Sequence, residues 1–175
     1  MAMKIFGLAG WSGSGKTTLM VRLLPELVGR GHTVSTIKHA HHTFEIDTPG
    51  KDSYEHRGAG ATEVMITGGM RWALMHENRD AGEPVIEDLM RHMTPVDLLM
   101  VEGFKSYDHP KLEVHRQATG KPLICGEDDR IVAVASDEPV EGSSIPVLDL
   151  NDIPAIADFI IGYCGLEGRT EHGAA

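Results

Sequence analysis

Short apolar runs alternate along the chain with stretches of helical periodicity, and this alternation predicts an α/β fold. Residues 4–9 form the first apolar run, and leucines then recur at helical spacing over residues 16–30. Residues 33–38 alternate between polar and apolar side chains, which is typical of a second strand. A strand, a helix and a strand in this order predict a βαβ unit of a parallel sheet. Pro25 lies inside the predicted helix, where we expect a kink.

The rest of the chain continues this pattern with one exception. Strands are expected over residues 96–103, 111–116 and 131–135, and helices over residues 53–60, 84–93 and 153–164. The exception is residues 63–77, where two strand-like runs flank Gly68 and Gly69 and predict a β-hairpin. We expect this hairpin to extend the sheet in the antiparallel sense and to leave open edges, which a second subunit would cover.

The first strand leads into Gly10-Trp11-Ser12-Gly13-Ser14-Gly15-Lys16-Thr17, which matches the pattern G-x-x-x-x-G-K-[ST] at every required position. The glycines allow the backbone to turn so that successive N–H groups form an anion nest. The helix that follows points its positive N-terminal end at the same anion. Lys16 is expected to reach the β- and γ-phosphates and is a candidate catalytic residue. The residues predicted to bind a nucleoside triphosphate are Gly13, Ser14, Gly15, Lys16, Thr17 and Thr18.

A metal site is predicted from the acidic residues in the apolar run over residues 96–103. Asp97 and Glu102 stand about 16 Å apart along a strand, so they cannot share one site. Ligands of parallel sheets bind at the carboxyl ends of the strands, which selects Glu102. Glu102 and the hydroxyl of Thr17 are therefore the predicted ligands of a Mg²⁺ ion, bound directly or through water. The alternative is an ordinary surface carboxylate at the end of a strand.

The long polar segment over residues 39–52 follows the second strand, at the edge where the phosphate-binding loop opens. Its length and position suit a switch that responds to the γ-phosphate. Asp47 could orient an attacking water and is a candidate catalytic residue, although loop charges are often only solvated. His39, His41 and His42 could bind a transition metal or an anionic substrate. Histidines that bond to the backbone or to phosphate are the favoured interpretation.

Two further observations concern the base and the phosphates of the predicted ligand. Asp137 follows the apolar run over residues 131–135, and its carboxylate could accept hydrogen bonds from N1–H and N2 of guanine. Adenine does not offer these donors in the same arrangement. Lys105 follows one predicted strand and Arg116 ends the next, where each could meet a ligand anion or simply neutralise nearby acids.

Composition narrows the class of protein. The 175-residue length suits one nucleotide-binding domain, which we assign to residues 1–165, with a disordered tail over residues 166–175. The formal net charge of −10 argues against a nucleic-acid partner, and no apolar run is long enough to span a membrane. Without the features of a signal peptide, a cytoplasmic location is expected. Cys125 and Cys164 are too few and too far apart in sequence for a disulfide framework or a metal site.

Five further motifs follow the phosphate-binding loop in order, namely Thr36-Ile37-Lys38-His39, Pro49-Gly50-Lys51-Asp52-Ser53, Arg71-Trp72-Ala73-Leu74-Met75, Val101-Glu102-Gly103-Phe104-Lys105 and Ala133-Val134-Ala135-Ser136-Asp137. Together with the loop they resemble the MobB family of molybdopterin-guanine dinucleotide biosynthesis adaptor proteins. The loop alone occurs in many families, whereas the motifs over residues 49–53 and 101–105 are far more specific. The resemblance covers about residues 4–165.

The sequence and this resemblance together predict an α/β, three-layer P-loop NTPase fold with a mostly parallel central sheet and an added antiparallel β-hairpin. The resemblance implies a GTP-binding, weakly GTP-hydrolysing accessory protein of molybdenum cofactor synthesis. It also implies a homodimer with an intersubunit sheet that acts with a guanylyltransferase, the enzyme that attaches GMP to molybdopterin. Contact of this chain with molybdopterin itself stays open. The resemblance strengthens Asp137 as the residue that recognises guanine.

Hydrolysis of GTP should be slow, because no obvious arginine finger or catalytic glutamine follows the acidic strand. Two other functions stay open at this point. One is a small-molecule kinase that transfers the γ-phosphoryl group, and the other is a nucleotide-dependent metallochaperone that uses the loop histidines.

Overall fold

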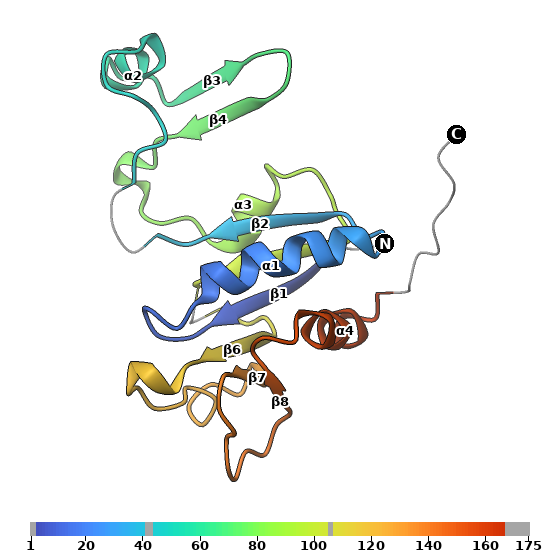
Figure 1. Cartoon of the computed structure of the whole chain (residues 1–175). Helices are drawn as coiled ribbons and strands as arrows, with labels where there is room; N and C mark the ends of the chain where they lie inside the picture. Colours follow the sequence, from blue (N-terminus) through green and yellow to red (C-terminus); the bar gives the residue numbers. More distant parts are fainter. Residues whose placement is uncertain (1–2, 41–43, 105–106, 167–175) are drawn as a thin grey trace, which may run out of the picture. The chain divides into compact units, whose positions relative to one another are not determined.

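The computed structural model describes residues 3–40, 44–104 and 107–166, and the chain forms two compact units (Figure 1). The first unit combines Met1–His39 with Pro95–Ala175, and the second is Ala40–Thr94. Residues 167–175, which make up most of the expected tail, lie outside the described residues. The assignment of residues 1–165 to a single domain stays a prediction.

The first unit is built on a parallel sheet. Its strands are β1 (Lys4–Ala9), β2 (Val34–Lys38), β5 (Leu98–Glu102), β6 (Lys111–His115), β7 (Ile131–Ser136) and β8 (Val147–Asp149). They lie in the order β2-β5-β1-β6-β7-β8, and every neighbouring pair is parallel. The carboxyl ends of all six strands therefore lie at one edge. The edge strand β8 was missed from the sequence because it has only three residues, of which none is fully buried.

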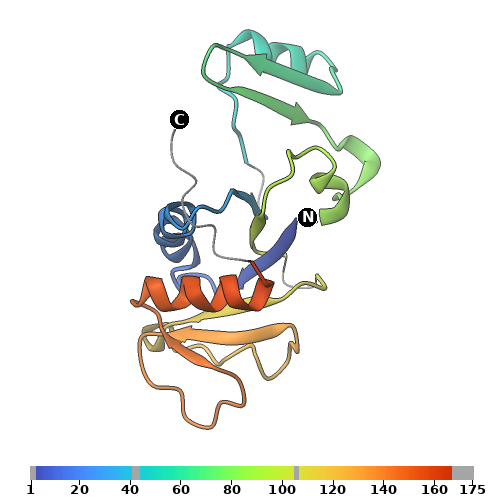
Figure 2. The same ribbon diagram turned by 90° about the vertical axis from the view of Figure 1, so that its right-hand side faces the viewer.

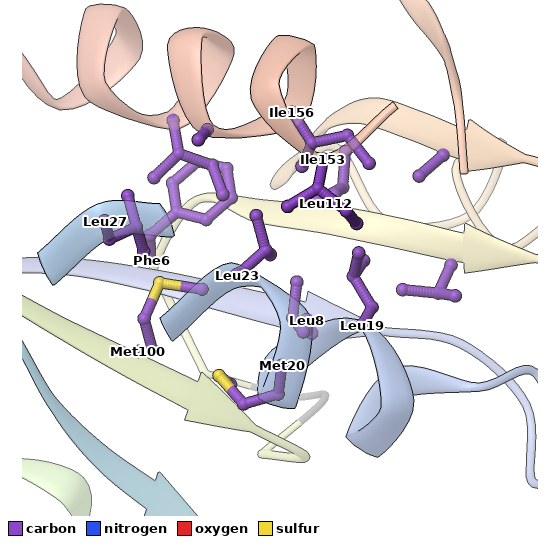
Figure 3. Packing of buried hydrophobic residues seen from close by; sticks show 14 of the residues in the cluster. Phe6, Leu8, Leu19, Met20, Leu23, Leu27, Met100, Leu112, Ile153 and Ile156 are labelled. Atoms are coloured by element: carbon purple, nitrogen blue, oxygen red, sulfur yellow. The ribbon is translucent and has the colours of Figure 1, made fainter. Parts of the chain in front are cut away.

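Two long helices pack on this sheet. α1 (Lys16–Gly29) and α4 (Ile153–Cys164) lie side by side and contact β1 (Figures 1 and 2). Figure 3 shows their apolar side chains meeting those of the strands, with Leu23 of α1 and Ile156 of α4 close to Leu112 of β6. These side chains are fully buried, and removing them from water is the main driving force for this packing.

The ends of these helices follow from local chemistry. α1 begins directly after Gly15, continues through Pro25 and ends at Gly29. The N-terminus of α4 is capped by Asp152, whose carboxylate accepts a hydrogen bond from the backbone N–H of Ala155 at 3.0 Å. Its C-terminus is closed by a residue in the left-handed conformation, Gly165, for which glycine is favoured.

The second unit contains the predicted hairpin. Its elements are α2 (Asp52–Gly58), β3 (Glu63–Thr67), β4 (Trp72–His76), a 3-10 turn (Arg79–Ala81) and α3 (Ile86–Met90). β3 and β4 are antiparallel, with Thr67 opposite Trp72 across the Gly68-Gly69 turn. They form a separate two-stranded sheet against which α2 packs, so the expectation that the hairpin extends the parallel sheet is wrong. α3 is shorter than predicted because Val85 is still extended and no side chain caps the helix.

The predicted fold class is confirmed as a mostly parallel sheet with helices and an antiparallel hairpin. Among the described residues, no helix is long and apolar enough to cross a membrane.

A substitution in β1 tests how tightly the sheet is packed. A Cβ atom on Gly7 would lie 2.5 Å from Nε2 of the buried His109 ring and 2.9 Å from its Cδ2. We expect Gly7→Ala to lower the free energy of unfolding by about 1–3 kcal/mol, because the ring must move within a packed interior. Urea denaturation followed by circular dichroism measures this loss.

The matched control is Gly29→Ala at the end of α1, where a Cβ atom would meet nothing within 4 Å. It should leave stability unchanged or raise it by up to about 1 kcal/mol. Equal stability of the two variants would contradict the packing described for Gly7.

Candidate functional site

The parallel register brings four predicted site segments to one edge of the sheet. β1 lies between β5 and β6, and Leu8 of β1 pairs with Glu102, the last residue of β5. Beyond β1 the chain enters Gly10–Thr17, here called the Gly-rich loop. Arg116 and Asp137 follow β6 and β7 at the same edge. Residues that lie 85 or more positions further along the chain therefore surround the loop.

Backbone geometry at the Gly-rich loop requires glycine. Gly10, Gly13 and Gly15 have φ angles of 140°, 83° and 95°, a region that other residues rarely adopt. A Cβ atom on Gly10 would also lie 2.5 Å from the carbonyl oxygen of Val114. The loop therefore turns tightly beside β6 before α1 begins, as the sequence pattern predicts.

Two side chains of the Gly-rich loop are suited to binding an anion. Nζ of Lys16 donates hydrogen bonds to the carbonyl oxygens of Gly10 and Trp11, both at 2.9 Å, so the ammonium is held across the loop. The Ser14 side chain is buried, and its Oγ has no hydrogen-bond partner in the part of the chain that is described. An unsatisfied buried hydroxyl is costly, and a ligand or a water can satisfy it. Thr18 is exposed in the first turn of α1.

The two predicted metal ligands are brought together. Oγ1 of Thr17 donates a hydrogen bond of 2.7 Å to Oε1 of Glu102, although the two residues are 85 positions apart in sequence. Nζ of Lys38 lies 3.8 Å from the same carboxylate oxygen. Glu102 is the more enclosed member of that ion pair, with 12% of its side chain exposed against 62% for Lys38.

This pair of oxygen atoms fits a Mg²⁺ ion. Mg²⁺ prefers hard oxygen ligands at about 2.1 Å in octahedral geometry, so adjacent ligands lie about 3 Å apart. The hydroxyl of Thr17 and the carboxylate of Glu102 are such ligands, and their separation of 2.7 Å is close to that spacing. A bound Mg²⁺ would supply positive charge to neutralise phosphate oxygens.

Asp137 lies in a network next to the Gly-rich loop. Its Oδ1 accepts a hydrogen bond of 3.1 Å from the backbone N–H of Gln117, and its Oδ2 lies 3.3 Å from Nη1 of Arg116. A carboxylate has about four acceptor positions, so two remain for a ligand. Nothing in the sequence indicated that Asp137 and Arg116 form a pair, because they follow different strands.

The segment after β6 is fixed beside the loop by residues that sequence reasoning missed. Glu113 is fully buried in β6, and its carboxylate accepts hydrogen bonds from the backbone N–H groups of Ile124 and Cys125 at 2.8 and 2.9 Å. Nε1 of Trp11 donates a hydrogen bond of 2.8 Å to the carbonyl oxygen of Pro122. No clear signal indicated Glu113, because the polar residues of β6 alternate with Leu112 and Val114, a pattern typical of one solvent-facing side, whereas all five residues are buried.

Asp47 belongs to the second unit, and its predicted catalytic role stays a prediction. Its Oδ1 accepts hydrogen bonds from the backbone N–H of Thr48 and from Oγ of Ser53, both at 2.9 Å. Its Oδ2 is buried and has no hydrogen-bond partner among the residues described. One carboxylate oxygen therefore organises the turn before α2.

The predicted histidine cluster is only partly described. The backbone N–H of His39 donates a hydrogen bond of 2.8 Å to the carbonyl oxygen of Glu102, and its ring lies 4.7 Å from the ring of Phe104. His41, His42 and Lys105 lie outside the described residues. In residues 3–40, 44–104 and 107–166, no group of three or more histidines, cysteines and acids is arranged to hold a metal ion.

Both cysteines are free thiols. Burial in the apolar core raises the pKa of Cys164 to about 11. Burial and the negative charge of Glu113 raise the pKa of Cys125. A thiol is nucleophilic as its thiolate, so these shifts argue against thiol chemistry at neutral pH.

Comparison with known proteins decides the family. The sequence profile described as "Molybdopterin guanine dinucleotide synthesis protein B" matches residues 5–137. A molybdopterin-guanine dinucleotide biosynthesis adapter protein of Escherichia coli (strain K12) is 41% identical over 162 residues, which are 91% of this chain and 92% of that protein. The chain belongs to the MobB family.

Other members of the MobB family agree with this assignment. The adapter protein of Haemophilus influenzae is 44% identical over 159 residues, covering 89% of this chain and 86% of that protein. A crystal structure of molybdopterin-guanine biosynthesis protein B superimposes with a TM-score of 0.72 at 26% identity, covering 91% of this chain and 99% of that one. The resemblance inferred from the sequence motifs is thereby confirmed.

Proposed function

We propose that the protein binds GTP together with Mg²⁺ at the edge formed by the Gly-rich loop, Glu102 and Asp137. Membership of the MobB family places it in molybdopterin guanine dinucleotide biosynthesis as an adapter protein. The guanylyltransferase enters the proposal as a partner from the family resemblance, which leaves contact with molybdopterin open. The proposed location is the cytoplasm.

The observation that carries the proposal is the contact between Thr17 and Glu102. A hydroxyl at the start of α1 and a carboxylate at the end of β5 meet at 2.7 Å beside the loop, where they would hold a Mg²⁺ ion whose charge would neutralise phosphate. Lys16 already holds its ammonium across the same loop, and it would exchange the carbonyl oxygens of Gly10 and Trp11 for phosphate oxygens. These groups supply binding and charge neutralisation.

Base selection is assigned to Asp137. Its remaining acceptor positions suit the N1–H and N2–H donors of guanine, and its hydrogen bond from Gln117 fixes its orientation. Hydrolysis of GTP is proposed to be slow, because no obvious arginine finger or catalytic glutamine follows the acidic strand in the sequence.

The second unit is proposed to form a homodimer through its hairpin. Four apolar side chains on or beside β3 and β4 are exposed, with exposed fractions of 60% for Met65, 44% for Ile66, 94% for Met70 and 61% for Trp72. Exposed apolar groups on a short two-stranded sheet are typical of an interaction surface. A second copy of this chain is the occupant that the family resemblance implies.

The proposed base selection is tested by calorimetric titration. We expect the wild-type protein to bind GTP more tightly than ATP, and Asp137→Asn to lower GTP affinity by about 10–100-fold. The same variant should gain affinity for xanthosine triphosphate, because the amide of asparagine can donate to the O2 atom of xanthine. Glu138→Gln, a change at the exposed neighbouring acid, is the control and should bind like wild type. Equal affinity of the wild type for GTP and ATP would contradict the assignment of Asp137.

The proposed dimer is tested by sedimentation analysis. We expect the wild-type protein to sediment as a dimer and Trp72→Lys to sediment as a folded monomer, because a charge would replace an exposed aromatic side chain of the hairpin. Val28→Lys, at a 56% exposed position of α1, is the matched control and should stay dimeric. A monomeric wild type, or a Trp72→Lys dimer of wild-type stability, would show that the hairpin is not the interface.

A further inference from the structure

Arg116 lies between the Gly-rich loop and Asp137, and the proposed function does not use it. On one side its Nη1 lies 3.3 Å from Oδ2 of Asp137. On the other side, a Cβ atom on Gly15 would lie 3.1 Å from its Nε and 3.6 Å from its Nη2. The guanidinium group therefore rests against the backbone of the residue that precedes Lys16.

Both the backbone and the side chain of Arg116 are held in place. Its carbonyl oxygen accepts hydrogen bonds from the backbone N–H and the hydroxyl of Thr119, at 3.0 and 2.8 Å. Asp137 holds the guanidinium group with one carboxylate oxygen and the backbone N–H of Gln117 with the other. A side chain that is held in place before a ligand arrives loses little entropy when the ligand binds.

The edge of the guanidinium group that faces the loop is available to a ligand. Within the described part of the chain, neither Nε nor Nη2 of Arg116 donates to a protein acceptor. About 35% of the side chain is exposed, so solvent and ligands reach it. The Nε and Nη2 groups form the planar fork with which arginine binds a phosphate or a carboxylate through two parallel hydrogen bonds.

This geometry differs from that of an arginine that only neutralises an acid. Such an arginine is expected to turn its two-donor edge toward the carboxylate, since the bidentate pair is the stronger one. Arg116 instead uses the single donor Nη1 for Asp137, at 3.3 Å, and places the other edge against Gly15. Its positive charge also separates the carboxylate of Asp137 from the anion that the loop would hold.

We propose that Arg116 binds the α- and β-phosphates of the nucleotide through its Nε and Nη2 atoms. This inference rests on the proposed function, because it needs a nucleotide with its phosphates at the Gly-rich loop and its base at Asp137. Arg116 lies between these two ends and therefore meets the part of the nucleotide that connects them. In this arrangement the γ-phosphate would be bound by Lys16 and by the Mg²⁺ ion that Thr17 and Glu102 would hold.

The test compares GTP, GDP and ATP by calorimetric titration of the full chain. Arg116→Ala should bind GTP and GDP more weakly by a similar factor of roughly 10–100, the range of a charge-assisted hydrogen bond to phosphate. The ratio of GTP to ATP affinity should stay as in wild type, because Arg116 does not touch the base. Arg116→Lys should recover part of the loss, since it keeps the charge without the fork.

The matched control is Arg130→Ala, which removes an arginine that precedes β7 and pairs with Asp108 and Asp129. It should keep wild-type affinity for all three nucleotides, and melting curves should show that each variant is folded. Unchanged affinity of Arg116→Ala for GTP and GDP would overturn the inference. A loss restricted to GTP would also overturn it, because that loss would place Arg116 at the γ-phosphate.

A fall in the ratio of GTP to ATP affinity in Arg116→Ala would equally count against the inference, since it would show that Arg116 acts only by holding Asp137. If the wild-type protein binds neither GTP nor GDP, the proposed function fails and the inference fails with it. If the wild type binds both and Arg116→Ala binds them as tightly, only the inference fails.

Discussion

The parallel pairing of β1 with β5 on one side and β6 on the other is the constraint on which the candidate site depends. It sets Leu8 opposite Glu102, so the chain leaves β1 for the Gly-rich loop beside the acid that ends β5. The same pairing places Arg116 at the neighbouring carboxyl end. The apolar side chains of α1 and α4 pack together with those of the strands, which keeps the loop and the first turn of α1 fixed on the strands. A shift of β1 by one residue would separate Thr17 from Glu102.

Much of this arrangement could be predicted from the sequence, because its signals are local. The pattern from Gly10 to Thr17 specifies a turn and a helix start, and the acid at the end of a fully apolar run specifies the carboxyl end of a central strand. Because parallel sheets bind ligands at that end of their strands, Thr17 and Glu102 could be predicted to lie at the same site. The helix α4 also begins and ends where its polar cap and its glycine predict.

The remaining features depend on contacts between distant segments, which no local pattern specifies. The pair of Arg116 and Asp137 joins residues that follow β6 and β7, and the buried carboxylate of Glu113 holds a loop 11 and 12 residues further on. The hairpin was predicted, but its separation from the parallel sheet was not, because hydrophobic alternation does not say which strand a neighbour will pair with. These contacts give the site its charge distribution, with the positive groups Lys16 and Arg116 beside the loop of a chain whose net charge is −10.

The proposed Mg²⁺ site of Thr17 and Glu102 serves a nucleotide bound at the Gly-rich loop. Its most direct test is the affinity for GTP measured with Mg²⁺ and with a chelator, in the wild-type protein and in Glu102→Gln. We expect Mg²⁺ to strengthen GTP binding to the wild type by at least about tenfold, the effect of one charge-assisted contact, and Glu102→Gln to lose most of this gain. Without Mg²⁺, the affinity of the variant should be as high as that of the wild type or higher, because a negative charge is removed. Equal GTP affinity of the wild type with and without Mg²⁺, or an undiminished gain in Glu102→Gln, would contradict the proposed Mg²⁺ site.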